Sequence, residues 1–291
     1  MSKILVTGAK GLLGTSLVIN LKKHNYDVIE HSRSQNADVD TDLSDFTQVC
    51  SLLDQKRPDY VINLAALTNV DECEKHPNKA YQANVLIVEN ISNWIHKTNN
   101  SCHLIHISTD QVYDGKGADK EENISLTNYY AFSKYASELA VKHIPCTVLR
   151  TNFFGPSQCK ERTSISDWLI ESLSNKKTIT VFDDVYFSPL SIDSLIKMII
   201  AVVMKPRAGI YNLGSKKGLS KAEFAFELAK VMELPVDYVT RGTSKDVKLL
   251  ACRPKDMRMD SSKFEKDFEV VLPTLLQEIQ SMKGAYSHET R

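Results

Sequence analysis

Short apolar runs alternate with longer amphipathic segments through the first half of the chain. The short runs are rich in β-branched residues and predict strands at Lys3–Thr7, Asp27–Ser32, Tyr60–Asn63, His103–Ser108 and Thr147–Arg150. The longer segments predict helices at Gly11–Lys23, Asp45–Lys56, Ala80–Lys97 and Tyr130–Val141. Because parallel strands need crossover connections, usually helices, this order predicts an α/β fold with a doubly wound parallel sheet.

The rhythm changes after Arg150. Polar loops now separate the elements, which are predicted strands at Ile179–Phe182 and Ile210–Leu213 and predicted helices at Ser191–Met204 and Ser220–Met232. We therefore expect a smaller C-terminal lobe over the carboxyl edge of the sheet, where open α/β sheets bind ligands. The expected division is a dinucleotide-binding domain over residues 1–151, with return segments from about 178–214, and a mainly substrate-binding lobe over residues 152–291.

The composition excludes several classes of function. The chain has 291 residues, 42% hydrophobic and 25% charged, with a formal net charge of zero, so no overall field draws it to nucleic acid or anionic membrane. The apolar run at the N-terminus is too short for a signal peptide, and Leu195–Met204 is too short to span a bilayer. Six scattered cysteines without a CxxC pair indicate reduced thiols in a cytoplasmic protein. Eight histidines without HxxxH or HExxH spacing predict no metal site.

The strongest local signal is the glycine-rich turn Thr7–Gly14, which follows a predicted strand and opens a predicted helix, as in Rossmann-type folds. Gly8 permits a tight turn, Gly11 lets the backbone approach a pyrophosphate, and Gly14 allows the helix to pack close to the strand. The free N–H groups and the positive dipole end of the helix favour an anion there. The turn residues expected to bind a dinucleotide are Gly8, Lys10, Gly11, Leu12, Leu13 and Gly14.

The GxxGxxG spacing of this turn, rather than GxGxxG, resembles the short-chain dehydrogenase/reductase superfamily and predicts a tyrosine–lysine pair downstream. Tyr130 and Lys134 supply that pair one helical turn apart, and Thr109 follows the preceding predicted strand. A nearby ammonium lowers the pKa of a phenol, so Lys134 is expected to bring the pKa of Tyr130 toward neutral pH and to hold the nicotinamide ribose. Thr109 is expected to hydrogen-bond the substrate carbonyl or alcohol during hydride transfer.

Four further segments narrow the resemblance: Ile107–Gly115, Val148–Thr151, Val61–Asp71 with Asn84 beyond it, and Arg253–Asp260. Together with the tyrosine–lysine pair, they resemble the dTDP-4-dehydrorhamnose reductases over nearly the whole chain. That resemblance implies NAD(P)H-dependent reduction of a 4-keto group on a nucleotide-diphospho-deoxysugar.

The same resemblance assigns residues to both ligands. It implies that Asn63, Ala65 and Ala66 line the cofactor cleft and that Arg253 lies near the substrate. The chain departs from the family pattern at two places close to the expected sugar site. Asn152–Gly155 stands where the family tends to carry serine–tryptophan, and Gln111 stands where it usually has tyrosine. They leave the class of chemistry intact and the identity of the sugar open. The residues expected to contact the substrate are Asp110, Asn152, Phe153 and Arg253.

The end of the second predicted strand bears on the type of cofactor. An acidic side chain there accepts from the adenosine ribose 2′-hydroxyl, whereas a basic one suits a 2′-phosphate. Ser32 and Arg33 fall at this end, which favours NADP, while Glu30 would favour NAD if the strand ended two residues earlier. Asp42 and Leu43 are candidates for contact with the adenine.

Two other functions stay open. A 4-epimerase or dehydratase would use the same scaffold, although Gln111 replaces the glutamate that dehydratases of this group usually carry after Thr-Asp, which argues against dehydration. A non-catalytic regulatory subunit is the second, because the methionine adenosyltransferase β-subunit resembles the same reductases. The partners expected are a nucleotide-linked sugar as substrate and, as a candidate assembly, a homodimer, with no nucleic acid and no membrane.

Overall fold

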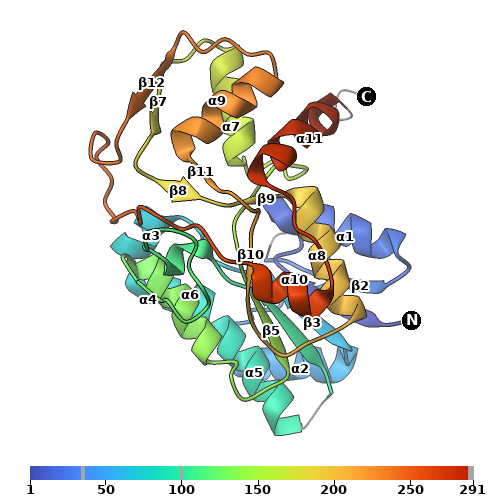
Figure 1. The fold of residues 1–291 in the computed structure, drawn as a ribbon. Coiled ribbons are helices and arrows are strands. Elements are labelled where there is room, and N and C mark those ends of the chain that lie inside the picture. Colours follow the sequence, from blue (N-terminus) through green and yellow to red (C-terminus); the bar gives the residue numbers. More distant parts are fainter. Residues whose placement is uncertain (34–36, 99–100, 288–291) are drawn as a thin grey trace.

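The computed structural model describes residues 1–33, 37–98 and 101–287. Its centre is a six-stranded parallel sheet in the order β10-β5-β4-β3-β1-β2 (Figure 1). The chain runs from β1 outward to β2 and then returns to β3 on the other side, so the switch in strand order lies between β1 and β3. The predicted α/β fold is confirmed. The strands are β1 (Lys3–Thr7), β2 (Asp27–His31), β3 (Tyr60–Asn63), β4 (His103–Ile107), β5 (Cys146–Thr151) and β10 (Gly209–Leu213).

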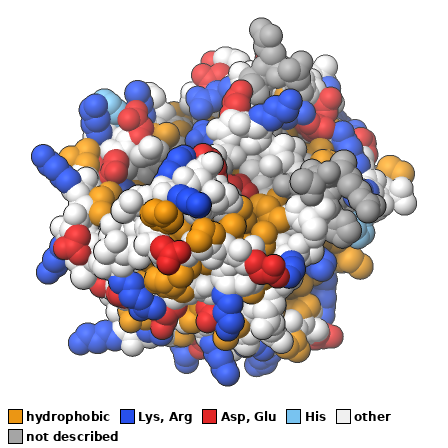
Figure 2. Space-filling view, turned by 90° about the horizontal axis from the view of Figure 1, so that it is seen from above, with side chains coloured by type: hydrophobic (Ala, Val, Ile, Leu, Met, Phe, Trp, Pro, Cys, Tyr) orange, Lys and Arg blue, Asp and Glu red, His pale blue; other side chains and the backbone are white. Residues whose placement is uncertain are grey.

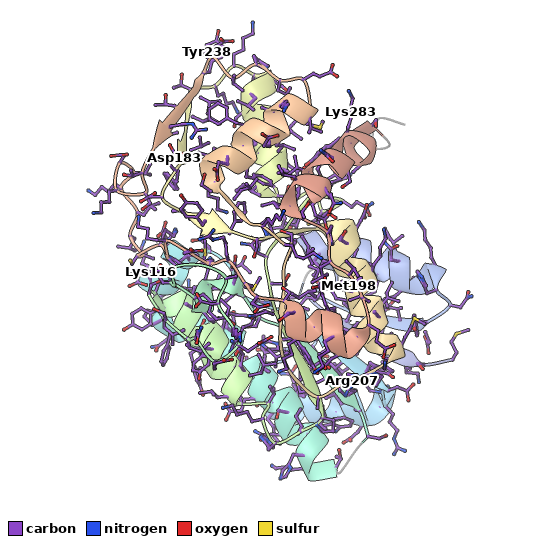
Figure 3. All side chains as sticks on the ribbon, in the orientation of Figure 1. Lys116, Asp183, Met198, Arg207, Tyr238 and Lys283 are labelled. Atoms are coloured by element: carbon purple, nitrogen blue, oxygen red, sulfur yellow. The ribbon has the colours of Figure 1, made fainter. Side chains whose placement is uncertain are left out.

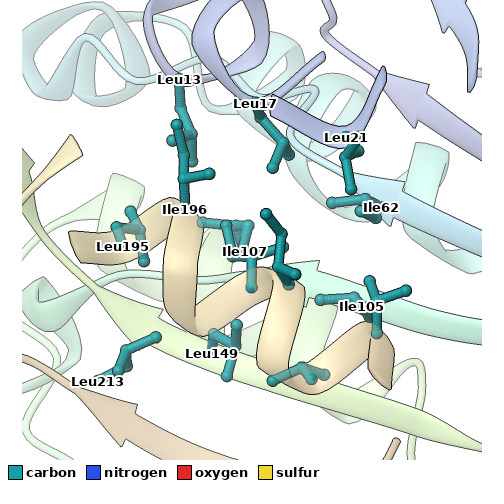
Figure 4. Close-up of a cluster of buried hydrophobic side chains, with 14 of the residues drawn as sticks. Leu13, Leu17, Leu21, Ile62, Ile105, Ile107, Leu149, Leu195, Ile196 and Leu213 are labelled. Carbon is teal, nitrogen blue, oxygen red and sulfur yellow. The ribbon is translucent and has the colours of Figure 1, made fainter. Parts of the chain in front are cut away.

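Helices cover both faces of this sheet, because successive strand residues point to opposite sides. Ile4 and Val6 of β1 pack on one face with residues of α1 and α8, as Figure 4 shows for Leu13, Leu17 and neighbouring side chains. Leu5 packs on the opposite face with residues of α2 and α5. The first face carries α1 (Leu12–Lys23), α8 (Ile192–Met204) and α10 (Ser262–Phe268), and the second carries α2 (Phe46–Lys56), α5 (Ile87–Thr98) and α6 (Tyr129–Leu139).

A second lobe lies beyond the carboxyl end of the sheet (Figure 1). Its own buried core joins three helices and several short strands. The helices are α7 (Ile165–Ser174), α9 (Lys221–Val231) and α11 (Leu275–Ser287). The strand pairs are β6 (Phe153–Phe154) with β9 (Leu190–Ser191), β8 (Tyr186–Phe187) with β11 (Leu219–Ser220), and β7 (Ile179–Phe182) with β12 (Val239–Gly242).

One part of the predicted domain division is wrong. The return to the first domain was expected from about residue 178, but β7 pairs with β12 and buries Ile179 and Val181 in the core of the second lobe. Figure 3 shows Asp183 and Tyr238, which adjoin these two strands, far from Arg207 beside the six-stranded sheet. The return is made instead by α8, β10 and also α10, whose aromatic side chains join the core beneath the sheet. The boundary near residue 151 stays a prediction.

Most predicted helices begin where a side chain caps them. Asp45, Ser191 and Ser220 each accept a backbone N–H of the first turn of α2, α8 and α9. The predicted helix Ala80–Lys97 is divided into a π-helical turn, η1, and α5. η1 (Tyr81–Leu86) falls within that predicted helix, whereas α3 (Val70–Lys75), α4 (Pro77–Ala80) and the 3₁₀ turn η2 (Asp110–Val112) are among the short helical elements that the pattern did not predict. These are too short for a helical period to be recognised.

Charges of both signs are scattered over the face of the second lobe seen in Figure 2. This mixture agrees with the formal net charge of zero. Across the part of the chain that is described, no helix has both the length and the hydropathy needed to cross a membrane.

Gly14 provides a test of the packing between α1 and β1. A Cβ atom at this position would lie 2.2 Å from the Gly8 carbonyl oxygen and 2.8 Å from the Ala9 carbonyl carbon, both in the backbone. We expect Gly14→Ala to lower the free energy of unfolding by roughly 1–3 kcal/mol or more, because the backbone must move to admit the methyl group. Urea denaturation measures the change.

Gly284→Ala is the matched control, since α11 leaves open space around a Cβ there. The control should be neutral or gain up to about 1 kcal/mol from helix propensity. A Gly14→Ala protein as stable as the wild type would contradict the proposed close packing.

Candidate active site

The glycine-rich turn forms a cradle between the end of β1 and the start of α1. Gly8 has φ +67°, and a Cβ on it would lie 3.0 Å from the Ala65 backbone nitrogen in the loop after β3. The Gly11 N–H donates to the Gly8 carbonyl over 2.9 Å. Helix α1 starts at Gly11 without a side-chain cap, which leaves the N–H groups of its first turn without a side-chain acceptor. A cradle that a side chain would fill, beside such N–H groups, fits the pyrophosphate of a dinucleotide.

The loop after β3 is held against this cradle by Thr7. Its hydroxyl accepts the N–H groups of Leu64 and Ala65 over 3.2 Å each and donates to the Asn63 side-chain oxygen over 2.6 Å. Ala65 and Ala66 lie half-buried beside Gly8, as expected for a cofactor cleft. The sequence pattern did not identify Thr7, although it opens the glycine-rich turn.

Two residues expected at the cofactor instead have side chains inside the protein. Asn63 is fully buried, and its amide nitrogen lies 3.1 Å from Nδ1 of His106 on β4 while its oxygen accepts from Thr7. Both ends of the Asn63 side-chain amide are therefore hydrogen-bonded to the neighbouring strands β1 and β4, so this amide is not free for the cofactor, and the place of Asn63 at the cleft stays a prediction. Leu13 packs its side chain into the core, so only its backbone N–H faces the turn.

Two lysines form ion pairs with the carboxylate of Glu30 at the end of β2. Lys10 and Lys22 donate to Glu30 over 2.5 and 2.6 Å, and the Glu30 side chain is 12% exposed. Burial opposes ionisation of Glu30, but the hydrogen bonds from the two lysines outweigh it and lower the pKa. Arg33 is exposed three residues later. The strand end therefore presents basic groups, while its acidic group is already neutralised.

Of the two residues predicted to contact the adenine, Leu43 is buried and Asp42 is exposed. Leu43 packs in the core between α2 and α5, and its carbonyl accepts from Asn90, so its side chain does not face a ligand. Asp42 lies at the surface and accepts from the N–H and hydroxyl of Ser44. The Ser44 hydrogen bonds, together with the charge of Arg33, lower the pKa of Asp42.

The three residues expected to act in catalysis converge at the end of β4. Thr109 follows β4 and caps η2 by accepting the Gln111 N–H over 3.2 Å. Tyr130 lies in the first turn of α6, close enough to the Thr109 hydroxyl for that hydroxyl to lower the pKa of its phenol. Lys134 lies one turn later and donates to the Ile107 carbonyl over 2.7 Å.

The electrostatics of Tyr130 differ from the expectation. Burial raises the pKa of Tyr130 and the Thr109 hydroxyl opposes this, but Lys134 is not among the groups that act on it. The prediction that Lys134 lowers this pKa is wrong for the described arrangement, because the ammonium points to the Ile107 carbonyl. Burial also lowers the pKa of Lys134 to about 8, with Glu138 opposing. The phenol is consequently protonated at neutral pH, which is the form that can give up a proton.

A buried ion pair between Glu138 and Arg150 lies next to Thr109, Tyr130 and Lys134. The Glu138 carboxylate accepts from the Arg150 guanidinium, with a shortest distance of 2.6 Å, and from the Ser108 hydroxyl over 2.5 Å. Arg150 also donates to the Tyr113 hydroxyl over 2.6 Å. Arg150, Ser108 and Tyr113 lie in the segments that carried the family resemblance. Together with Glu138 they form one buried hydrogen-bonded group.

The residues expected at the substrate meet around Asp110. Its carboxylate accepts from the Asn152 amide over 2.7 Å and from the Thr109 hydroxyl over 3.3 Å. Burial raises the pKa of Asp110 to about 6, although Asn152 and the charge of Lys221 oppose it. Phe153 follows in β6 and is half-buried. Sequence reasoning missed Lys221, which no motif marks.

Arg253 lies on a segment that crosses from the second lobe to the first. Its guanidinium pairs with Asp71 of α3 over 3.0 Å and donates to the Ala251 carbonyl. Asn128, which caps α6 two residues before Tyr130, donates to the Cys252 carbonyl over 2.9 Å. The segment is therefore attached beside the proposed catalytic helix.

Within the described ranges, no group of three or more His, Cys, Asp or Glu side chains is arranged to hold a metal ion.

Residues 2–287 match the family model described as the RmlD substrate binding domain. The chain belongs to this family. It is 27% identical over 292 residues to the dTDP-4-dehydrorhamnose reductase of Aggregatibacter actinomycetemcomitans, covering 93% of this chain and 94% of that one. It is also 26% identical over 286 residues to methionine adenosyltransferase 2 subunit beta of Xenopus tropicalis, covering 91% and 82%.

Solved structures agree with this assignment to the RmlD family. The crystal structure of dTDP-4-dehydrorhamnose reductase from Bacillus anthracis in complex with NADP has a TM-score of 0.87 and 25% sequence identity, covering 97% of this chain and 98% of that one. The predicted resemblance to dTDP-4-dehydrorhamnose reductases is thus confirmed.

The buried carboxyl of Asp110 predicts how stability depends on pH in this RmlD-family chain. Its folded pKa of about 6 lies above the unfolded value, so the folded state loses stability as pH rises from about 4 through 6. We expect Asp110→Asn to be more stable than the wild type at pH 7.5, by up to about 3 kcal/mol, since one pKa unit is worth about 1.4 kcal/mol.

The comparison requires urea unfolding at pH 4.5 and pH 7.5. The gain should be much smaller at pH 4.5, where the wild-type carboxyl is already neutral. Asp237→Asn, at an exposed position, is the control and should show no such difference. An equal effect of Asp110→Asn at both pH values would contradict the buried, raised pKa.

Proposed function

We propose that this protein reduces a 4-keto group on a nucleotide-diphospho-deoxysugar with NADPH. The observation that carries the proposal is the convergence of Thr109, Tyr130 and Lys134 at the end of β4, beside the turn Gly8–Gly14. The names of the reductase relatives support this class of substrate. A 4-epimerase on the same scaffold is the alternative enzyme.

Each residue of the group has a separate task. The bound dinucleotide supplies the hydride. Thr109 donates a hydrogen bond to the substrate carbonyl and fixes its position. Tyr130, protonated because burial raises its pKa, gives its proton to the carbonyl oxygen as negative charge develops there. Lys134, one helical turn after Tyr130, binds the nicotinamide ribose.

NADP is the proposed cofactor. Glu30 is held by Lys10 and Lys22, which makes it a poor partner for a free ribose 2′-hydroxyl. Arg33 and Lys10 offer positive charge for a 2′-phosphate at the same strand end. The NADP complex of the Bacillus anthracis relative supports this choice.

A regulatory subunit is the rival from another class, and the similarity to methionine adenosyltransferase 2 subunit beta favours it. The complete group of Thr109, Tyr130 and Lys134 favours an enzyme. NADPH oxidation by the purified protein alone, over a panel of nucleotide-linked keto sugars, tests the proposal. Turnover with one of them supports it, whereas no turnover together with stable co-purification of a catalytic partner supports the rival. Cytoplasmic location and a homodimer stay predictions.

Tyr130→Phe tests the proton transfer. We expect kcat to fall by roughly 10²–10⁴-fold, because the phenol acts in the transition state, while the Kd for NADPH changes little. Steady-state kinetics with the best substrate of the panel and calorimetric titration with NADPH measure the two quantities. Tyr129→Phe, at the exposed neighbouring tyrosine, is the control and should keep full activity. Near-normal turnover of Tyr130→Phe would rule out the phenol as the proton donor.

Arg33→Asp tests the choice of cofactor. The ratio of kcat/KM for NADPH to that for NADH should fall at least about tenfold, since the variant loses a charge-assisted contact and repels the 2′-phosphate. Arg207→Asp, beside β10 at the opposite edge of the sheet, is the matched control and should leave the ratio unchanged. If Arg33→Asp also leaves it unchanged, Arg33 does not contact the cofactor.

A further inference from the structure

The second lobe contributes one lysine to the neighbourhood of the proposed reaction centre. Lys221 is the first residue of α9, and hydrogen bonds within the helix start and to the preceding strand region hold its backbone in place. Ser220 and Glu223 cap the helix reciprocally, and the Lys221 N–H donates to the Val185 carbonyl over 2.8 Å. The pairing of β8 with β11 therefore aims this helix start toward the first lobe (Figure 1).

The side chain of Lys221 is half-buried, and its ammonium lies against an aromatic ring of the second lobe. It sits 3.6 Å from the centre of the Phe187 ring, and Phe187 is fully buried. Its charge also acts on Asp110, which belongs to the first lobe and bonds Thr109 and Asn152. Burial lowers the pKa of Lys221 to about 8, so most of it is still charged at neutral pH.

This ammonium differs from the other basic groups of the second lobe that lie toward the site. Arg253, Lys255 and Arg258 are each paired with a carboxylate. Among residues 1–33, 37–98 and 101–287, Lys221 makes neither a hydrogen bond nor an ion pair through its side chain. An ammonium that is partly withdrawn from solvent and keeps its charge without a hydrogen-bond acceptor is destabilising, and an anionic ligand oxygen offsets that cost.

From these contacts we infer that Lys221 is a specificity-determining residue, whose ammonium binds an anionic oxygen of the sugar nucleotide next to the sugar ring. The inference rests on the proposed function, which places the reacting carbonyl at Thr109. A ligand that extends from Thr109 past Asp110 into the second lobe brings its sugar ring and the phosphate attached to it alongside Lys221. The anionic oxygen belongs either to the diphosphate or to a carboxylate on the sugar.

Calorimetric titration of wild type and Lys221→Met with thymidine diphosphate, UDP-glucose and UDP-glucuronate separates these sources. If the diphosphate is bound, Lys221→Met weakens all three ligands by about 10- to 100-fold, as expected for loss of one charge-assisted contact. If a sugar carboxylate is bound, only UDP-glucuronate is weakened, and the wild type prefers it to UDP-glucose. Either result supports the inference and identifies the oxygen.

Controls keep the test independent of folding and of catalysis. Lys230→Met, at an exposed lysine of the same helix, should bind all three ligands like the wild type. Lys221→Met should be at least as stable as the wild type in thermal unfolding, because it no longer carries an ammonium without an acceptor. Its NADPH binding should match the wild type, and Lys221→Arg should recover part of the lost affinity. No turnover is needed, so a failure of the proposed reduction leaves these affinities interpretable.

Three outcomes overturn the inference. They are unchanged affinity of Lys221→Met for all three ligands, equal losses in Lys230→Met, and absence of binding by the wild type. If affinity is unchanged while the pH dependence of stability set by Asp110 moves, Lys221 serves only to balance the Asp110 charge, and the assignment as a ligand-binding residue is wrong.

Discussion

The buried ion pair between Glu138 and Arg150 is the contact on which the proposed site depends. Their side chains are 0% and 1% exposed, so each charge would be costly to bury without the other. Glu138 lies one turn after Lys134 on α6, and its other partner, Ser108, directly precedes Thr109. The pair therefore holds the helix that carries two proposed catalytic groups against the strand end that carries the third.

Burial also shifts the pKa values of the groups around the proposed reaction centre. It raises the pKa of Asp110 and Tyr130 and lowers the pKa of Lys134 and Lys221. Each shift favours the neutral form, because a low dielectric penalises charge of either sign. Asp110 and Lys134 belong to the first lobe and Lys221 to the second, so the second lobe changes the electrostatics of a site whose proposed catalytic residues all belong to the first.

Much of the fold and the centre of the candidate site followed from local patterns. The glycine turn Gly8–Gly14 and the pair Tyr130 and Lys134 have fixed spacings whose geometry is set within one turn or helix. Thr109 could be added because the carboxyl ends of parallel strands meet at one edge. The short helices after β3 could not be predicted, because they are too short to show a helical period. The pairing of β7 could not be predicted because its partner, β12, lies about sixty residues further along the chain.

The sequence alone thus determined the alternating α/β order, the dinucleotide turn and the three residues proposed for catalysis, because each is encoded by spacing over a few residues. Only the tertiary structure decided which polar side chains are free to meet a ligand. The Asn63 side chain is hydrogen-bonded to neighbouring strands and Glu30 is paired with two lysines. Among the described residues, Lys221 has no hydrogen-bond or ion-pair partner for its ammonium, whose charge acts on Asp110. The burial, the hydrogen-bond partners and the pKa of a side chain depend on neighbours that folding brings from distant positions in the sequence. A local sequence pattern therefore does not contain them.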